Sequence, residues 1–443
     1  MDVASAIERK VGARVAQADH AGDYVTANPF SPERLGGDLF NLSMSKQARP
    51  LLERVTEFIA KEIDPVTEEY VRLGADRTDR WSFAPGQLEL LDSIKKKAKT
   101  ARLWNFFLPD ADSGEGLRNL DYAYIAIELG KNPLAPECFN CSAPDTGNME
   151  VLERVGSSEQ KERWLQPLLD GQIRSAYAMT EPDVASSDAR NISCTAVLDG
   201  DEWVINGEKY FITGAGDPRC EVIILMAKTH PGAASHQQHS QMLVPMDQPG
   251  VQVAGPMLVF GHDDAPHGHM HLRFSNVRVP RENVLLAEGR GAEVAQLRLG
   301  PGRIHHCMRA IGAAERALQL AVERGLSRTA FGQPLISLGK NTEWAARARI
   351  DIEAMRLMVL QAANAMDLLS VEDARIWVSA VKAMVPERVC QIIDQAIQLH
   401  GATGLSQWTP LADLYMTQRT TRLVDGPDEV HHMVVGRAEL ARY

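Results

Sequence analysis

The chain has 443 residues, of which 44% are hydrophobic and 24% are charged, an ordinary composition for a folded protein. This length exceeds what one small core requires and predicts two to four packed units. The net charge of -11 argues against a general nucleic-acid or anionic-membrane binder, because neutralising phosphate groups requires a basic surface.

The sequence contains no run of about 18 apolar residues that would span a bilayer. The N-terminus "MDVASAIERKVGARVAQ" lacks the apolar core of a secretory signal, so we expect a cytoplasmic protein that is not an integral membrane protein. The six cysteines are scattered and predict no disulfide framework. "CFNC", Cys138 to Cys141, has redox or zinc spacing, but no second ligand pair follows at a suitable distance.

The period of the apolar residues changes twice along the chain. Residues 1–44 show no sustained period and predict an extended N-terminal arm. Residues 45–175 show helical spacing, as in Leu88, Leu91 and Ile94. Residues 176–287 alternate as strands do, and residues 288–443 return to long helical blocks. The fold class is therefore α+β: helices, then a β-domain, then a helical bundle that supports oligomerisation.

Two turn signals interrupt "CTAVLDGDEWVINGEKYFITGAG" in the β-domain. The Asn206-Gly207 pair is the stronger of them, because this dipeptide favours the tight turns of β-hairpins. We therefore expect a hairpin at Asn206-Gly207.

Three stretches carry possible chemistry. "AYAMTEPDVASSDA" is rich in small residues, hydroxyls and backbone donors, which suits either a ligand loop or a polar linker. "GHDDAPHGHMH" alternates imidazoles between His262 and His271 and suits either a zinc centre or a polar loop that enters a strand. "RLVDGPDEVHH" predicts a helix start with Asp425 as its cap and Pro427 in the first turn. The same turn also allows the Asp425 carboxylate to point away from its own helix.

Five motifs in this order resemble the acyl-CoA dehydrogenase family: "AMTEP", "NGEKYFITGAG", "RTAFGQPL", "IQLHGATG" and "DGPDEVH". Together with "LGPGRIHHCMRAIG" they resemble the subgroup of the kinase-fused vertebrate members ten and eleven, here without a kinase domain. The resemblance implies an N-terminal helical domain, a middle β-domain of barrel or sandwich type, and a C-terminal four-helix bundle. It also implies FAD as cofactor.

The resemblance assigns binding roles to several residues. Phe211 stands where many relatives have Trp, and Pro427 and Glu429 stand where Thr and Gln are commoner. The implied cofactor-binding residues are Met179, Thr180, Ser186, Phe211, Thr213, Arg328, Phe331, Gln398, Gly401, Ala402, Pro427 and Glu429. The implied substrate-binding residues are Ser187 and Arg303. Arg328 and Phe331 would reach the FAD of a neighbouring subunit, so we expect a homodimer or a homotetramer.

The resemblance implies that Asp425 is the catalytic base, at the position where most relatives have a glutamate. Some relatives carry the base on the long helix instead, where this chain has Gly302. The implied reaction is α,β-dehydrogenation of an acyl-CoA thioester to a trans-2-enoyl-CoA. The α-proton passes to Asp425, the β-hydride passes to the flavin, and electron-transfer flavoprotein accepts the electrons.

Three alternatives stay open at this stage. The same fold acts as an acyl-CoA oxidase or as a nitroalkane oxidase in other relatives. A zinc hydrolase would use the histidines between His262 and His271. A flavin-binding scaffold without turnover is the third alternative.

Overall fold

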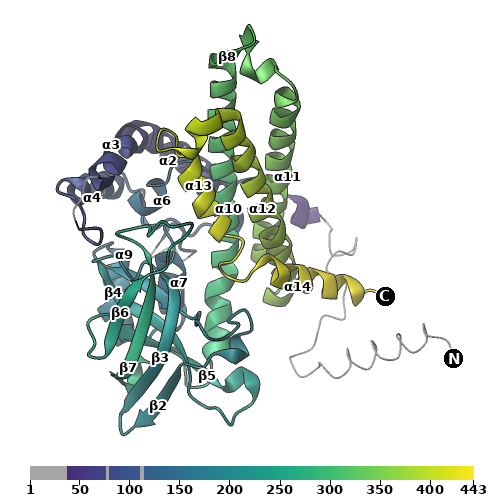
Figure 1. The fold of residues 1–443 in the computed structure, drawn as a ribbon. Coiled ribbons are helices and arrows are strands. Elements are labelled where there is room, and N and C mark those ends of the chain that lie inside the picture. Colours follow the sequence, from purple (N-terminus) through teal and green to yellow (C-terminus); the bar gives the residue numbers. More distant parts are fainter. Residues whose placement is uncertain (1–36, 76–78, 110–113) are drawn as a thin grey trace, which may run out of the picture.

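The structure is a computed structural model that describes residues 37–75, 79–109 and 114–443. Figure 1 shows helices, a sheet and long helices in chain order. Of the predicted N-terminal arm, residues 1–36 lie outside the described residues. Next to them, Leu39 is buried, and the Asn364 amide donates to its carbonyl at 2.9 Å. This contact fixes the start of the described chain to the C-terminal helices.

The N-terminal unit is helical, as the apolar spacing predicts. Helices α2 (Ala48–Phe58) and α3 (Asp64–Ala75) are joined by a π-helical turn (Ile59–Ile63). They are followed by α4 (Gln87–Thr100), α5 (Asn119–Leu129), α6 (Ala135–Cys138) and α7 (Asp145–Val155). Short helices α8 (Ser158–Gln160) and α9 (Gln166–Leu169) flank a second π-helical turn, Lys161–Leu165. Cys138 and Cys141 are free and fully buried.

Seven strands form one hydrogen-bonded sheet in the order β1-β4-β2-β3-β7-β6, with β5 paired to β4. The strands are β1 (Arg174–Ala178), β2 (Thr195–Asp199), β3 (Glu202–Thr213), β4 (Cys220–Lys228), β5 (His239–Pro245), β6 (Val251–Pro256) and β7 (His269–Pro280). Their inward side chains, Trp203 and Phe274 among them, pack into a hydrophobic core of their own. The middle unit is therefore a separate β-domain.

The predicted hairpin at Asn206-Gly207 is wrong. The chain turns at the other signal, Gly200-Asp201, because Asp199 pairs with Glu202. Strand β3 continues through Gly207, where its register against β7 shifts. Gly207 has φ +147°, and a Cβ there would lie 2.8 Å from the Cα of Cys194. The glycine therefore permits a bulge and a close approach of the chain just before β2, rather than a turn.

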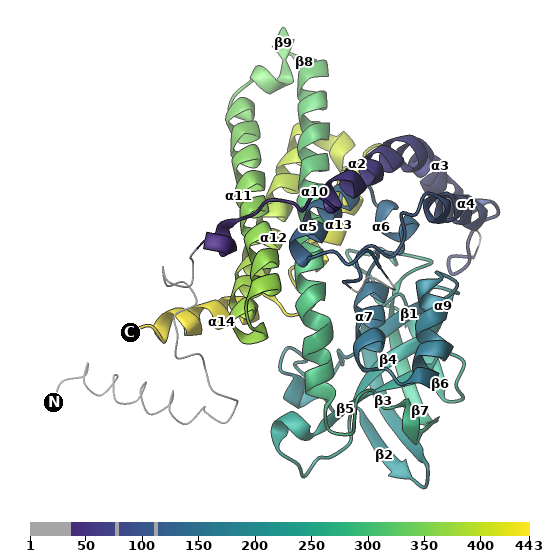
Figure 2. The same ribbon diagram turned by 180° about the vertical axis from the view of Figure 1, so that it is seen from behind.

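Long helices return after the sheet. Helix α10 (Gly291–Ser327) leads into a hairpin of β8 (Thr329–Ala330) and β9 (Gln333–Pro334). Helices α11 (Asn341–Leu368) and α12 (Val371–His400) follow, and then α13 (Leu411–Thr420) and α14 (Asp428–Leu440). Figures 1 and 2 show α10, α11 and α12 side by side, with the hairpin at the end of the bundle that lies away from the sheet. In the described part of the chain, no helix has the length and apolar character needed to span a membrane.

Helix α10 joins all three units. It packs against α5 and α7 of the N-terminal unit, β5 of the sheet, and α11 and α12 of the bundle. Its contact with α5 is very close, because a Cβ at Gly312 would lie 2.1 Å from the carbonyl oxygen of Ile127. Helix α10 therefore runs through the junction of the three units.

Candidate active site

The turn between α13 and α14 carries Asp425. Asp425 has φ +56° and Gly426 has φ +102°, so two successive residues adopt positive φ. Such a conformation is uncommon for a residue with a side chain and costs of order 1 kcal/mol or more, so surrounding contacts must hold it. Helix α14 begins after Pro427, which stands at the N-cap position. The predicted capping role of Asp425 is therefore wrong, because the positive-φ turn directs its carboxylate away from that helix.

The Asp425 carboxylate lies against α10. A Cβ built on Gly302 would lie 3.1 Å from Asp425 Oδ2 and near no other atom outside the helix. Arg298 and His306 stand four residues to either side of Gly302, so the three share one helix face. Their nitrogens lie 3.9 Å and 3.7 Å from the two carboxylate oxygens. The missing side chain at Gly302 leaves room for the carboxylate between them.

The charges around Asp425 favour its ionised form. Burial raises the pKa of Asp425, but His306 in its protonated form and the cations Arg298, Arg303 and Lys382 lower it further than burial raises it. Burial also lowers the pKa of His306 itself to about 4, so His306 is uncharged at neutral pH. Near pH 7 the lasting positive charges are therefore Arg298, Arg303 and Lys382.

Three side chains hold the main chain of this turn. Arg303 Nε donates to the Asp425 carbonyl at 2.9 Å, and His431 Nε2 lies 3.3 Å from the same oxygen. Lys382 Nζ donates to the Thr421 carbonyl at 2.5 Å and to the Gly426 carbonyl at 3.3 Å. The structure thus places Arg303, an expected substrate contact, on the backbone of Asp425.

Arg298 is itself held in place by a chain of polar contacts. Its guanidinium lies over the ring of Tyr177, 3.8 Å from the ring centroid, and its Nε donates to Asn148 Oδ1 at 2.9 Å. Asn148 donates to the Ser175 hydroxyl at 2.9 Å, and that hydroxyl donates to Asp145 Oδ1 at 2.6 Å. Helices α7 and α10 and strand β1 are therefore tied together beside Asp425.

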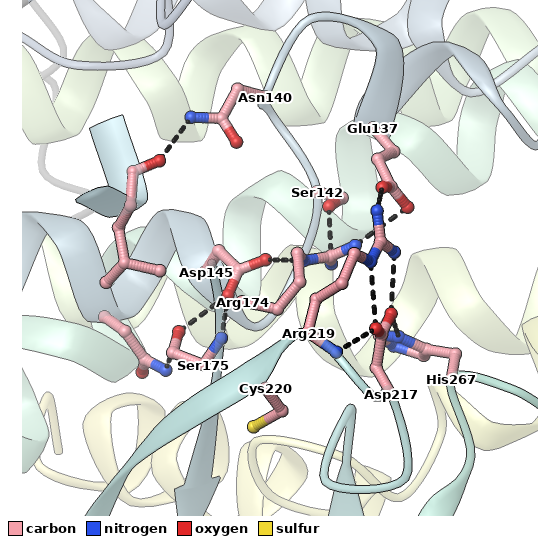
Figure 3. A network of polar contacts seen from close by, with 12 residues as sticks. Glu137, Asn140, Ser142, Asp145, Arg174, Ser175, Asp217, Arg219, Cys220 and His267 are labelled. Carbon is pink, nitrogen blue, oxygen red and sulfur yellow. Dashed lines mark hydrogen bonds and ion pairs between the residues drawn. The ribbon is translucent and has the colours of Figure 1, made fainter. Parts of the chain in front are cut away.

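Figure 3 shows the network that continues from Asp145. Arg174 pairs with Asp145 and, at 2.8 Å, with Glu137. Arg219 bridges Glu137 and Asp217 at 2.7 Å each. Burial raises the pKa of Glu137, but the cations Arg174, Lys95 and Arg219 outweigh it and hold the pKa well below its ordinary value. This network fixes the start of β1 against the N-terminal helices.

The expected cofactor residues of the β-domain lie on two adjacent segments. The Tyr210 amide donates to the Thr180 carbonyl at 3.0 Å, and Lys209 donates to the Met179 carbonyl at 2.9 Å. Phe211 has φ +53° and is 43% exposed as a residue, an unusual state for an aromatic residue on a strand. The structure thus brings Met179, Thr180, Phe211 and Thr213 to neighbouring positions.

The loop after β1 is ordered by a buried ion pair. Glu181 pairs with the fully buried Lys209 at 2.8 Å and accepts the Ser193 and Cys194 amides. The Ser186 hydroxyl accepts the Glu181 amide at 2.8 Å, whereas Ser187 is exposed. Ser186 is therefore engaged in the loop, and Ser187 is free to meet a ligand.

The remaining expected cofactor residues lie in the C-terminal helices and the β8–β9 hairpin. Arg328 and Phe331 lie at the β8–β9 hairpin, which Figures 1 and 2 place beyond the bundle end remote from the sheet. Phe331 has φ +49° and is 95% exposed. Gln398, Gly401 and Ala402, at the C-terminal end of α12, are exposed as well, and so is Glu429 in the first turn of α14. Within one chain the hairpin residues Arg328 and Phe331 therefore do not join the β-domain group.

The histidines of "GHDDAPHGHMH" do not form a metal site. His271 lies 2.6 Å from Glu208, His269 lies 3.6 Å from Asp264, and His267 lies 4.0 Å from Asp217. In the described ranges, no group of three or more His, Cys, Asp or Glu residues could hold a metal ion. The geometry therefore offers the zinc-hydrolase alternative no ligand set.

Sequence reasoning missed four residues of this site: Arg298, His306, Lys382 and His431. The four-residue spacing of Arg298 and His306 about Gly302 was a usable signal, because it places them on the helix face expected beside the base. Lys382 and His431 gave no such signal, since their proximity to Asp425 depends on how α12 and α14 pack.

Comparisons with known proteins agree with this architecture. Family models described as the N-terminal, middle and C-terminal domains of acyl-CoA dehydrogenase match residues 45–172, 176–277 and 289–440. A Mycobacterium abscessus structure assigned as an acyl-CoA dehydrogenase is 51% identical with a TM-score of 0.87, covering 90% of this chain and all of that chain. The FAD complex of PigA shares the fold with a TM-score of 0.75 at 22% identity, covering 90% of this chain and 99% of that one.

Two relatives show how far the similarity extends. Acyl-CoA dehydrogenase family member 10 of Mus musculus is 49% identical over 94% of this chain but only 39% of its own length. The chain thus spans less than half the length of this relative. FadE2 of Mycobacterium tuberculosis, assigned as an acyl-CoA dehydrogenase, is 48% identical over 91% of this chain and 97% of its own length. The chain belongs to the acyl-CoA dehydrogenase family.

Proposed function

We propose that the protein is an FAD-dependent acyl-CoA dehydrogenase in which Asp425 removes the α-proton of the acyl thioester. The observation that carries this proposal is the position of Asp425. A positive-φ turn held by three side chains presents its carboxylate to the open face of α10 at Gly302. A general base must be ionised and held in position, and both conditions are met here.

The described residues fit a flavin. Phe211 and Thr180 are exposed on adjacent β-domain segments, where a planar ligand can lie against them. Thr213 offers a hydroxyl beside them, whose partner is His269 Nδ1 at 3.0 Å. FAD, when bound, would supply the acceptor for the β-hydride. The chain's own part is to hold the thioester between this face and Asp425.

In the proposed reaction an Asp425 oxygen would take the α-proton. Bound FAD would supply the acceptor for the β-hydride, and the acyl group would become a trans-2-enoyl thioester. Excluding water when substrate binds raises the pKa of a carboxyl group and makes Asp425 a stronger base at that moment. Arg298 and Arg303 keep the carboxylate ionised before substrate arrives.

We further propose that two chains complete each cofactor site. Arg328 and Phe331 lie outside the β-domain group of their own chain, and an almost fully exposed phenylalanine is unfavourable in water. A second copy of the chain would bring these residues to the flavin. Mixing inactive Asp425→Asn with inactive Arg328→Ala tests this idea, because a shared site predicts partial recovery of activity in the mixed oligomer. No recovery after verified subunit exchange would contradict it.

The proposed function is tested by the visible spectrum of the purified protein. A flavin band that bleaches without oxygen on adding one of a panel of straight, branched, ring-bearing or hydroxylated acyl-CoAs supports dehydrogenation. Reoxidation by electron-transfer flavoprotein but not by air supports a dehydrogenase, whereas rapid reoxidation by air indicates an oxidase. Bleaching by nitroalkanes alone would contradict acyl-CoA as substrate.

A further inference from the structure

Lys382 is a fully buried lysine whose ammonium group lies behind the catalytic turn. It is placed midway along α12, with none of its surface exposed. Its Nζ donates to the carbonyls of Thr421 and Gly426, which lie on either side of Asp425 in the chain. The ammonium thus bridges the start and the end of the segment that presents the carboxylate.

Burying an ammonium group is costly, and a neutral side chain can also donate to carbonyls. A lysine or an arginine at this position adds a positive charge, which a neutral donor does not. Its acceptors are main-chain oxygens, so no carboxylate hydrogen-bonded to it neutralises that charge. Burial lowers the pKa of Lys382 below its ordinary value, and nearby Cys307, Asp425 and Asp428 offset only part of that decrease. Asp425 is therefore among the anionic groups that compensate the buried charge.

We propose that Lys382 is a positioning residue for proton abstraction: its buried ammonium fixes the turn that presents Asp425 and supplies a positive charge behind the carboxylate. The inference rests on the proposed role of Asp425 as base. Lys382 is the α12 residue of a site otherwise built from α10, β1, the turn before α14 and α14 itself.

Lys382 is one of the cations that lower the pKa of Asp425, with a smaller effect than Arg298 or Arg303. Burial lowers the pKa of His431 to about 4 and raises the pKa of Tyr177 to about 12, so both are neutral near pH 7, as is His306. The lasting charges are two arginines of α10 and Lys382 of α12. Removing one of three cations should raise the pKa of Asp425.

The main test compares Lys382→Met with Lys382→Arg by the pH dependence of kcat/KM, using the acyl-CoA that bleaches the flavin. In Lys382→Met the acidic limb should move to higher pH by on the order of one unit, because a nearby cation shifts a carboxyl pKa by about that much. We also expect kcat to fall about tenfold or more with little change in KM, because the base is misplaced only slightly. Lys382→Arg keeps the charge, so its acidic limb should stay near that of the wild type. An acidic limb in Lys382→Met that coincides with the wild type would overturn the inference.

Thermal midpoints in two backgrounds give a second test that needs no turnover. Lys382→Met should lower the midpoint more in the wild type than in Asp425→Asn, because only the wild type then buries an undercompensated carboxylate. If Lys382→Met lowered the thermal midpoint equally in the wild type and in Asp425→Asn, or prevented folding in both, a link to Asp425 would be contradicted. Full activity in Asp425→Asn would overturn the proposed function itself. An inactive Asp425→Asn together with an unmoved acidic limb in Lys382→Met overturns this inference alone.

Discussion

Gly302→Ala is expected to make the protein more stable and slower at the same time. An alanine Cβ at this position would lie 3.1 Å from Asp425 Oδ2, which is 0.3 Å closer than the 3.4 Å at which ordinary contact begins. The carboxylate must move by at least that much. Since a misplacement of about 1 Å costs on the order of a hundredfold in rate, 0.3 Å corresponds to about a fourfold loss of kcat. Replacing a glycine inside α10 should meanwhile stabilise the helix by about 1 kcal/mol.

Gly436→Ala is the matched control for this prediction. Gly436 lies inside α14, and a Cβ there would meet nothing within 4 Å. This variant should raise the thermal midpoint as Gly302→Ala does and leave kcat unchanged. Steady-state kinetics measure kcat of both variants, and thermal melts measure their midpoints. A Gly302→Ala enzyme with wild-type kcat would refute the idea that Asp425 works against this face of α10.

Three further predictions concern stability and pH. Gly207→Ala should destabilise the β-domain by about 1–3 kcal/mol in chemical denaturation, because the added Cβ would lie 2.8 Å from the Cys194 backbone; an unchanged midpoint would contradict the assigned bulge. Arg174→Met should cost about 3–5 kcal/mol, because it leaves Asp145 and Glu137 buried with less compensation, and a loss below about 1 kcal/mol would contradict that role. Burial raises the pKa of Glu150 from 4.5 to about 8. The contribution of this carboxyl group to the free energy of unfolding is therefore fully present below pH 4.5 and is lost as pH rises to about 8. Glu150→Gln should therefore gain about 3 kcal/mol relative to the wild type between pH 4.5 and pH 7, and parallel pH profiles of stability would contradict this.

Periodicity was sufficient to predict the order of helices, strands and helices, because burial of one face repeats every 3.6 residues in a helix and every two in a strand. It failed at Asn206-Gly207, where a dipeptide typical of hairpin turns serves a bulge in a long strand. Local propensity does not reveal that the chain at Cys194, just before β2, lies where a Cβ on Gly207 would have to be. The turn was set instead by Gly200.

The candidate site, like the fold, was predicted only in part from the sequence. Asp425 was predicted from a motif, but its backbone conformation depends on contacts from Arg303, Lys382 and His431, which come from three different helices. Such contacts arise from tertiary packing and leave no short-range pattern in the sequence. The charges that set the pKa of Asp425 were hidden for the same reason.

The most direct test of the account is the rate of anaerobic flavin bleaching by a reactive acyl-CoA, compared between the wild type and Asp425→Asn. Both proteins should purify with the same flavin band and bind the thioester. The account predicts that the wild type bleaches and that Asp425→Asn is slower by several orders of magnitude, because only the carboxylate removes the α-proton. Bleaching of Asp425→Asn at the wild-type rate would contradict Asp425 as the base.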